Sequence, residues 1–139
     1  MGDRSTLYLN YAACDKKAVE RKLGEPSYSD PVEDGIISAQ FDEVNWGGQT
    51  ELDAISKAGV PYWGKCEAGA GYAAVQLAGI GHIGYEFDAG FGSVDSLCVE
   101  FSLETGRMTG MLDAEKFRKR WLRAKTAVAK RAKTKGLKS

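Results

Sequence analysis

The chain has little of what most catalytic and metal-binding proteins use. It contains one histidine, His82, so a Ser-His-Asp or Cys-His arrangement has no other histidine base to draw on. Its three cysteines, Cys14, Cys66 and Cys98, are widely spaced, and none shows the C-x2–4-C spacing that lets one loop supply two zinc ligands. Their odd number also argues against a disulfide framework. We therefore expect buried free thiols, no metal site and no cofactor.

Long apolar runs are also missing. No stretch approaches the roughly 18 apolar residues of a membrane-spanning helix, and none has the charged start, apolar middle and small-residue cleavage site of a secretory signal. We therefore expect a cytoplasmic protein without membrane contact. The 139 residues are 43% hydrophobic and 27% charged, which is typical of one soluble domain. We expect that domain to cover residues 1–133, followed by a frayed tail at 134–139.

The charges are segregated along the chain, although 19 basic and 19 acidic residues cancel. Residues 113–139 hold eleven Lys or Arg against two acids, a net charge of +9, and residues 1–112 therefore carry −9. Within residues 25–112, fourteen acids against three bases give −11. Such an acidic body attracts cationic surfaces and repels nucleic acid. The basic segment has three candidate partners: nucleic acid, its own acidic body, and the acidic body of a second copy in a homo-oligomer.

Hydrophobic periodicity predicts an α+β fold. Alternating apolar residues predict strands at 5–12, 36–44, 72–78, 83–88 and 97–103. Short helices are predicted at 15–23 and 50–58, each ended by a glycine, and a long helix is predicted to begin at Asp113. Residues 25–35, with two prolines, are expected to form an acidic loop. We expect a mostly antiparallel sheet of about five strands with two short helices and a long basic C-terminal helix packed on one face.

The predicted C-terminal helix is amphipathic. Phe117, Trp121, Ala124 and Val128 recur at i, i+4, i+7 and i+11, so we expect Phe117 and Trp121 to be buried against the sheet. Cations fill much of the remaining surface, and a nucleic-acid-binding helix would use five of them: Arg118, Lys119, Arg123, Lys130 and Arg131. A solvated amphipathic helix has the same pattern, so both interpretations stay open.

The acidic body carries aromatic residues beside its acids. Trp and Tyr, with Arg, dominate the hot spots of protein interfaces. We therefore predict that a basic protein surface binds here, through Asp42, Glu43, Trp46, Tyr62 and Trp63.

A glycine-rich segment gives a third signal. Gly79 to Gly84 fits the G-x-G-x-x-G pattern of dinucleotide-binding folds, but residues 85–88 alternate like a strand where that fingerprint needs a helix. Glycine-rich turns between strands explain the pattern equally well. The third hypothesis is a small-molecule-binding protein or hydrolytic enzyme centred on this segment and His82. We rank it last and expect no enzymatic activity.

One stretch resembles a cassette in small uncharacterised proteins of bacteriophages and mobile elements. It consists of Phe41-Asp42-Glu43-Val44-Asn45-Trp46-Gly47-Gly48, then Leu52 and Ile55, then Ala58-Gly59-Val60-Pro61-Tyr62. In those proteins a strand ends in an acidic residue before Asn-Tyr-Gly or Asn-Trp-Gly, a short helix follows, and Gly-Ile/Val-Pro-aromatic begins the next strand. The cassette has no known chemistry, so no catalytic residue is implied.

Small acidic proteins of such genomes often inhibit host defence systems, including CRISPR and restriction systems. The resemblance thus implies a stoichiometric inhibitor that blocks the basic channel of a nucleic-acid-handling defence complex, such as a host nuclease or a CRISPR effector, in the host cytoplasm. The alternative is a nucleic-acid-binding module that uses the C-terminal helix.

Overall fold

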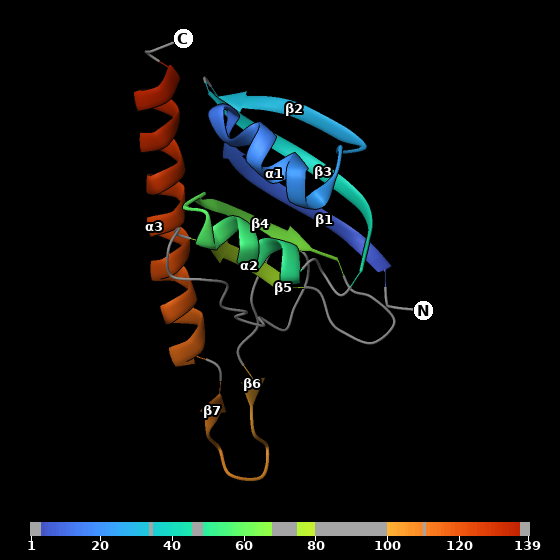
Figure 1. The fold of residues 1–139 in the computed structure, drawn as a ribbon. Helices are drawn as coiled ribbons and strands as arrows, with labels where there is room; N and C mark the ends of the chain where they lie inside the picture. Colours follow the sequence, from blue (N-terminus) through green and yellow to red (C-terminus); the bar gives the residue numbers. More distant parts are fainter. Residues whose placement is uncertain are drawn as a thin grey trace.

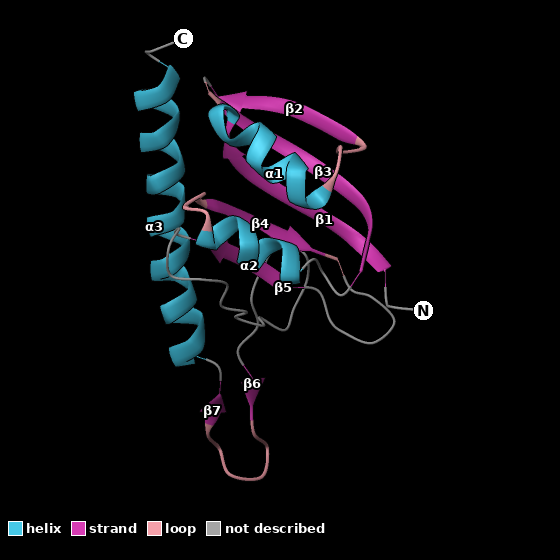
Figure 2. Cartoon of the chain, viewed as in Figure 1, coloured by secondary structure: helices cyan, strands magenta, loops and turns pink. Residues whose placement is uncertain are grey.

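The structure is a computed structural model that describes residues 4–33, 35–45, 49–67, 75–79, 100–109 and 111–136. The elements follow in the order β1 (Arg4–Ala12), the 3-10 helix η1 (Ala13–Asp15), α1 (Lys16–Leu23), β2 (Tyr28–Glu33), β3 (Ile36–Asn45), α2 (Gln49–Lys57), β4 (Tyr62–Cys66), β5 (Val75–Gly79), β6 (Glu100–Phe101), β7 (Met108–Thr109) and α3 (Met111–Gly136) (Figures 1 and 2).

Among the described residues, five strands form one antiparallel sheet in the order β2-β3-β1-β4-β5. β1 is central because its alternate residues Leu7, Leu9 and Tyr11 are fully buried on one face. β6 and β7 pair separately as a short hairpin. The predicted α+β class, with five antiparallel strands, two short helices and one long C-terminal helix, is confirmed.

The helices divide between the two faces of the sheet. Val19 of α1 and Leu52 and Ile55 of α2 pack with the buried face of β1, in the larger core cluster. α3 packs on the opposite face, where Phe117, Ala124, Val128 and Ala132 meet Ala12, Ile36, Trp63 and Ala78. The expectation that all three helices pack on one face is wrong, because α1 and α2 cover one face and α3 covers the other. Ala12, Ile36, Trp63 and Ala78 make the part of the second face beneath α3 apolar, so this part also needs a cover.

Strand β2 corrects the prediction that residues 25–35 form a loop. Tyr28 pairs with Gln40, and Asp30 pairs with Ser38, on the outer side of β3. The prolines led to the wrong prediction, because Pro31 lies in an edge strand, where a missing N–H is tolerated. A register irregularity between Pro31 and Glu33 ends the regular pairing.

The other elements follow the sequence with local differences. The predicted glycine stops after the two short helices are confirmed, since Gly24 and Gly59 have φ of 83° and 90°. The strand predicted at 97–103 ends early, because the amide of Ser102 donates to the Arg107 carbonyl and closes a turn that contains Leu103. α3 begins at Met111, before the predicted cap, and its helical backbone runs to Gly136.

Several predictions fall partly or wholly outside the described residues. The strand expected at 72–78 is seen as β5 only from Val75 onward. The strand at 83–88, the glycine pattern beyond Gly79 and His82 all lie outside the part of the chain that the structure describes. β4 was missed by periodicity, although the phage cassette implies a strand that begins at this point.

Candidate functional site

The predicted partner-binding residues do not share one surface. Tyr62 is fully buried, and its ring lies where a side chain on Gly79 would stand. Burial raises the pKa of the Tyr62 hydroxyl, which has no hydrogen-bond partner among the described residues. Trp63, the next residue along the strand, points to the opposite face and is half-buried beneath α3. The backbone of Glu43 belongs to β3, whereas Trp46 lies outside the described residues.

Asp42 is exposed at a β-bulge of β3. Asp42 and Glu43 both lie opposite Thr6 of β1, where the register shifts. The Gln40 side-chain amide donates to Asp42 Oδ1 at 3.0 Å, and the Thr6 hydroxyl donates to the same oxygen at 3.4 Å. These bonds, with one from Ser27, lower the pKa of Asp42 because they favour the carboxylate. Asp42 is therefore a fixed negative charge.

The sheet face around Asp42 is acidic and carries an exposed aromatic ring. Tyr28 and Asp30 of β2 lie opposite Gln40 and Ser38 of β3, so they share this face with Asp42. Tyr28 is 61% exposed, and Asp30 is also exposed. α3 crosses the same face nearer Ala12 and leaves this part uncovered. We call Tyr28, Asp30 and Asp42 the acidic face.

Polar contacts occupy the neighbouring part of this sheet face. The Tyr8 hydroxyl donates to Glu67 Oε1 at 2.9 Å, which raises the pKa of Tyr8 because the carboxylate holds the phenol proton. The Lys65 ammonium lies 5.5 Å from the centroid of the Tyr8 ring. Tyr8 therefore contacts both charged groups, and the opposite charges of Glu67 and Lys65 give the middle of the face little net charge.

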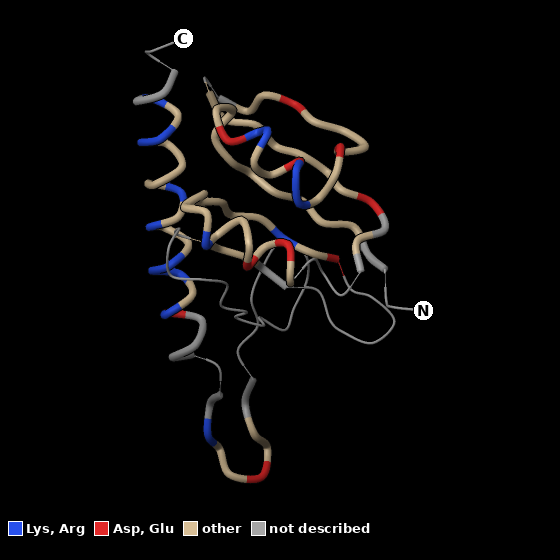
Figure 3. Tube along the Cα trace, in the orientation of Figure 1, with Lys and Arg blue, Asp and Glu red and all other residues tan. Residues whose placement is uncertain are grey.

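The long helix α3 directs a row of cations away from the sheet. Phe117, Ala124 and Val128 mark its buried side. At 3.6 residues per turn, the opposite side carries Lys116, Lys119, Arg123, Lys130 and Lys133, all of which are exposed. Within the described part of the chain, none of these five forms an ion pair. We call them the basic stripe. Figure 3 shows the Lys and Arg positions along α3 and acidic positions on β2 and β3.

The basic stripe contains three of the five predicted nucleic-acid contacts, namely Lys119, Arg123 and Lys130. Arg118 is exposed beside the stripe. Arg131 turns inward instead, and its Nε donates to Asp15 Oδ2 at 2.6 Å. The cations at both ends, Lys116 and Lys133, were missed, although each lies three residues from its nearest neighbour in the stripe, which was the available signal.

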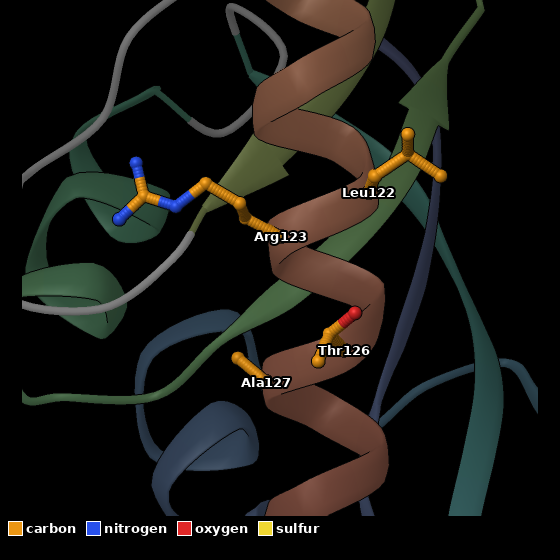
Figure 4. Close-up of a pocket in the computed structure, with 4 residues that line it drawn as sticks. All are labelled: Leu122, Arg123, Thr126 and Ala127. Atoms are coloured by element: carbon orange, nitrogen blue, oxygen red, sulfur yellow. The ribbon is translucent and has the colours of Figure 1, made fainter.

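A surface pocket lies beside Arg123 of the basic stripe. It is lined by Leu122, Arg123, Thr126 and Ala127, all from α3 (Figure 4). Figure 4 shows the long side chains of Leu122 and Arg123 extending from the helix in different directions, with the shorter Thr126 and Ala127 one turn further on. A guanidinium group and a hydroxyl group beside one depression are suitable donors for a phosphate oxygen.

Comparison with known proteins gives no match to a family model, a curated protein or a solved structure. Within the described ranges, no helix is long and apolar enough to cross a membrane. The same residues contain no group of three or more His, Cys, Asp or Glu side chains that could hold a metal ion. The two charged surfaces are therefore the features that point to a function.

Proposed function

We propose that the chain binds the phosphate backbone of nucleic acid through the basic stripe of α3. The observation that supports this most directly is that five exposed cations, none of them ion-paired within the described residues, lie on the side of the helix opposite its buried face. From Lys116 to Lys133 the stripe extends about 25 Å at 1.5 Å per residue. A duplex carries one charge per roughly 1.7 Å of axis, so about 15 phosphate charges lie along a stripe of this length, which is more than the five cations need.

We rank nucleic-acid binding above the hypothesis of a protein-binding surface, which led the predictions from the sequence, because of where the aromatic and cationic residues lie. That hypothesis placed Tyr62 and Trp63 on an exposed acidic surface, yet Tyr62 is fully buried and Trp63 lies against α3. The cationic positions instead lie along one side of α3. Backbone contacts of this kind carry no sequence information, so we expect binding that depends on salt and tolerates many sequences.

The basic stripe is tested by replacing Lys119, Arg123 and Lys130 together with Gln. For five phosphate contacts we expect log K to fall against log salt with a slope of about −4.5. Removing three contacts should reduce the slope to about −2. Fluorescence anisotropy with a labelled DNA duplex, at salt concentrations between about 50 and 200 mM, measures both slopes.

A matched control removes the same charge from another surface. Lys17, Arg21 and Lys22 are exposed on α1, which covers the opposite face of the sheet. Their replacement by Gln should leave the slope almost unchanged. Equal losses in both triple variants would show that net charge, and not the basic stripe, governs binding. A triple α3 variant with the original slope would refute the proposal.

We propose as a second function that the acidic face binds a basic protein and thereby inhibits a nucleic-acid-handling defence complex. Its support is the exposed Tyr28 ring beside the exposed carboxylates of Asp30 and Asp42, together with the resemblance to phage proteins. Charges at the edge of an interface mainly change the association rate, whereas buried aromatic side chains mainly change the dissociation rate. With such a partner, Asp30→Lys with Asp42→Lys should slow association and weaken its salt dependence, whereas Tyr28→Ala should speed dissociation in surface binding kinetics.

A further inference from the structure

The β6–β7 hairpin displays an apolar side chain that makes no contribution to a core. Leu103 is 94% exposed, and the other turn residues, 104–107, are exposed as well. Figure 1 shows the hairpin projecting away from the sheet, beyond the N-terminal end of α3. Single exposed leucines are common, so the exposure alone carries no argument. Leu103 is set apart by its position on a projecting turn whose backbone is hydrogen-bonded.

Hydrogen bonds fix the backbone that carries Leu103. The Ser102 amide donates to the Arg107 carbonyl at 2.8 Å, and the Gly106 amide donates to the Ser102 carbonyl at 2.9 Å. The Ser102 hydroxyl oxygen accepts from the amides of Glu104 and Thr105 at 3.3 and 3.2 Å. Gly106 has a φ of 73°, which a side chain would strain. Little conformational entropy is therefore lost when the tip meets a partner.

The hairpin is joined to the basic helix almost directly. β7 ends at Thr109 and α3 begins at Met111, so one residue separates them. A ligand that lies along the basic stripe and continues past the first turn of α3 meets the hairpin next (Figure 1). At the tip, Glu104 and Arg107 have opposite charges, so the apolar side chain is its distinguishing feature.

We propose that Leu103 inserts into the minor groove of a DNA duplex bound along α3 and wedges a base step apart. This inference rests on the proposed nucleic-acid binding by the basic stripe. Leucine is among the apolar residues that minor-groove proteins insert between base steps, and insertion kinks the duplex by about 20–90°. Electrostatic contacts along α3 hold the duplex, and the wedge determines its shape. Duplex DNA is the expected ligand because A-form RNA presents a wide, shallow minor groove.

The wedge is tested by measuring DNA bending with the full chain. Fluorescence energy transfer between the ends of a labelled DNA duplex should report a kink with the unchanged protein and a nearly straight duplex with Leu103→Ala. The salt slope should be equal for both proteins, because no phosphate contact is lost. The separate variant Leu103→Met should bend the duplex as the unchanged protein does, since methionine also inserts between base steps. Val32→Ala is the matched control, because Val32 is 57% exposed on β2 and should leave bending unchanged.

The outcomes separate the wedge from the proposed function. The wedge is overturned if the duplex stays straight with the unchanged protein, or if Leu103→Ala bends it equally. Binding by α3 would still be supported in that case if the salt dependence of binding depends on the basic stripe. Bending that is lost equally in Val32→Ala also overturns it. Absence of salt-dependent binding by the unchanged protein overturns both inferences.

Discussion

The substitution Gly64→Ala should abolish the native fold. Gly64 lies in β4 and pairs with Leu9 of the central strand β1. A Cβ at this position would overlap the backbone carbonyl oxygen of Tyr8 and lie 3.1 Å from the Leu9 Cα. Both obstacles are backbone atoms, so no side-chain rotation relieves the overlap. The two central strands would have to separate.

Separation of β1 from β4 affects both layers of the molecule. Leu7 and Leu9 of β1 are fully buried in the cluster that α1 and α2 cover. Trp63 of β4 packs beneath α3 in the clusters on the other face. Because domains are stable by only about 5–15 kcal/mol, loss of the central pairing should exceed what the remaining contacts supply.

Thermal melting followed by circular dichroism measures this effect. We expect Gly64→Ala to show no cooperative transition, whereas Lys65→Ala, which shortens the half-buried neighbouring side chain, should melt within a few degrees of the unchanged protein. A cooperative Gly64→Ala transition close to that of the control would contradict the close approach of the two strands.

Local sequence signals were sufficient for the elements that have one clear periodicity. β1 and β3 alternate apolar residues, and α1 and α2 end at glycines with positive φ. β2 was missed because its pairing with β3, and not its composition, makes it a strand, with Tyr28 opposite Gln40. Pro31 indicates a loop until the strand is known to lie at the sheet edge.

The functional surfaces were harder to predict because they depend on which face of the sheet each residue occupies. Tyr62 and Trp63 were grouped as exposed aromatics, but neighbouring residues on a strand point to opposite faces. Pairing of Gly64 with Leu9 directs Tyr62 into the core and Trp63 toward α3. The amphipathic pattern of α3 did predict burial of Phe117, which is 5% exposed, whereas Trp121 is only partly buried.

The substitution Arg131→Ala should destabilise the protein by about 3–5 kcal/mol, because it leaves a buried carboxylate without its cation. The Asp15 side chain is only 4% exposed, and the Arg131 Nε donates to its Oδ2 at 2.6 Å. The two residues are 116 positions apart, so no local pattern in the sequence indicates this pair. Urea unfolding of Arg131→Ala measures the loss, and Lys130→Ala, which removes an exposed neighbouring cation, should change stability by less than about 0.5 kcal/mol.

A double-mutant cycle separates two causes of the lost stability: the unpaired carboxylate of Asp15 and the lost packing of the Arg131 side chain. Asp15→Ala should cost less than Arg131→Ala, because the Arg131 side chain is 37% exposed and can regain water. Once Asp15 is alanine, removing Arg131 no longer leaves a buried anion, so the double variant should be more stable than Arg131→Ala alone. Additive losses would instead mean that the contacts around Val128 and Ala132, and not the ion pair, hold this end of α3 against the sheet.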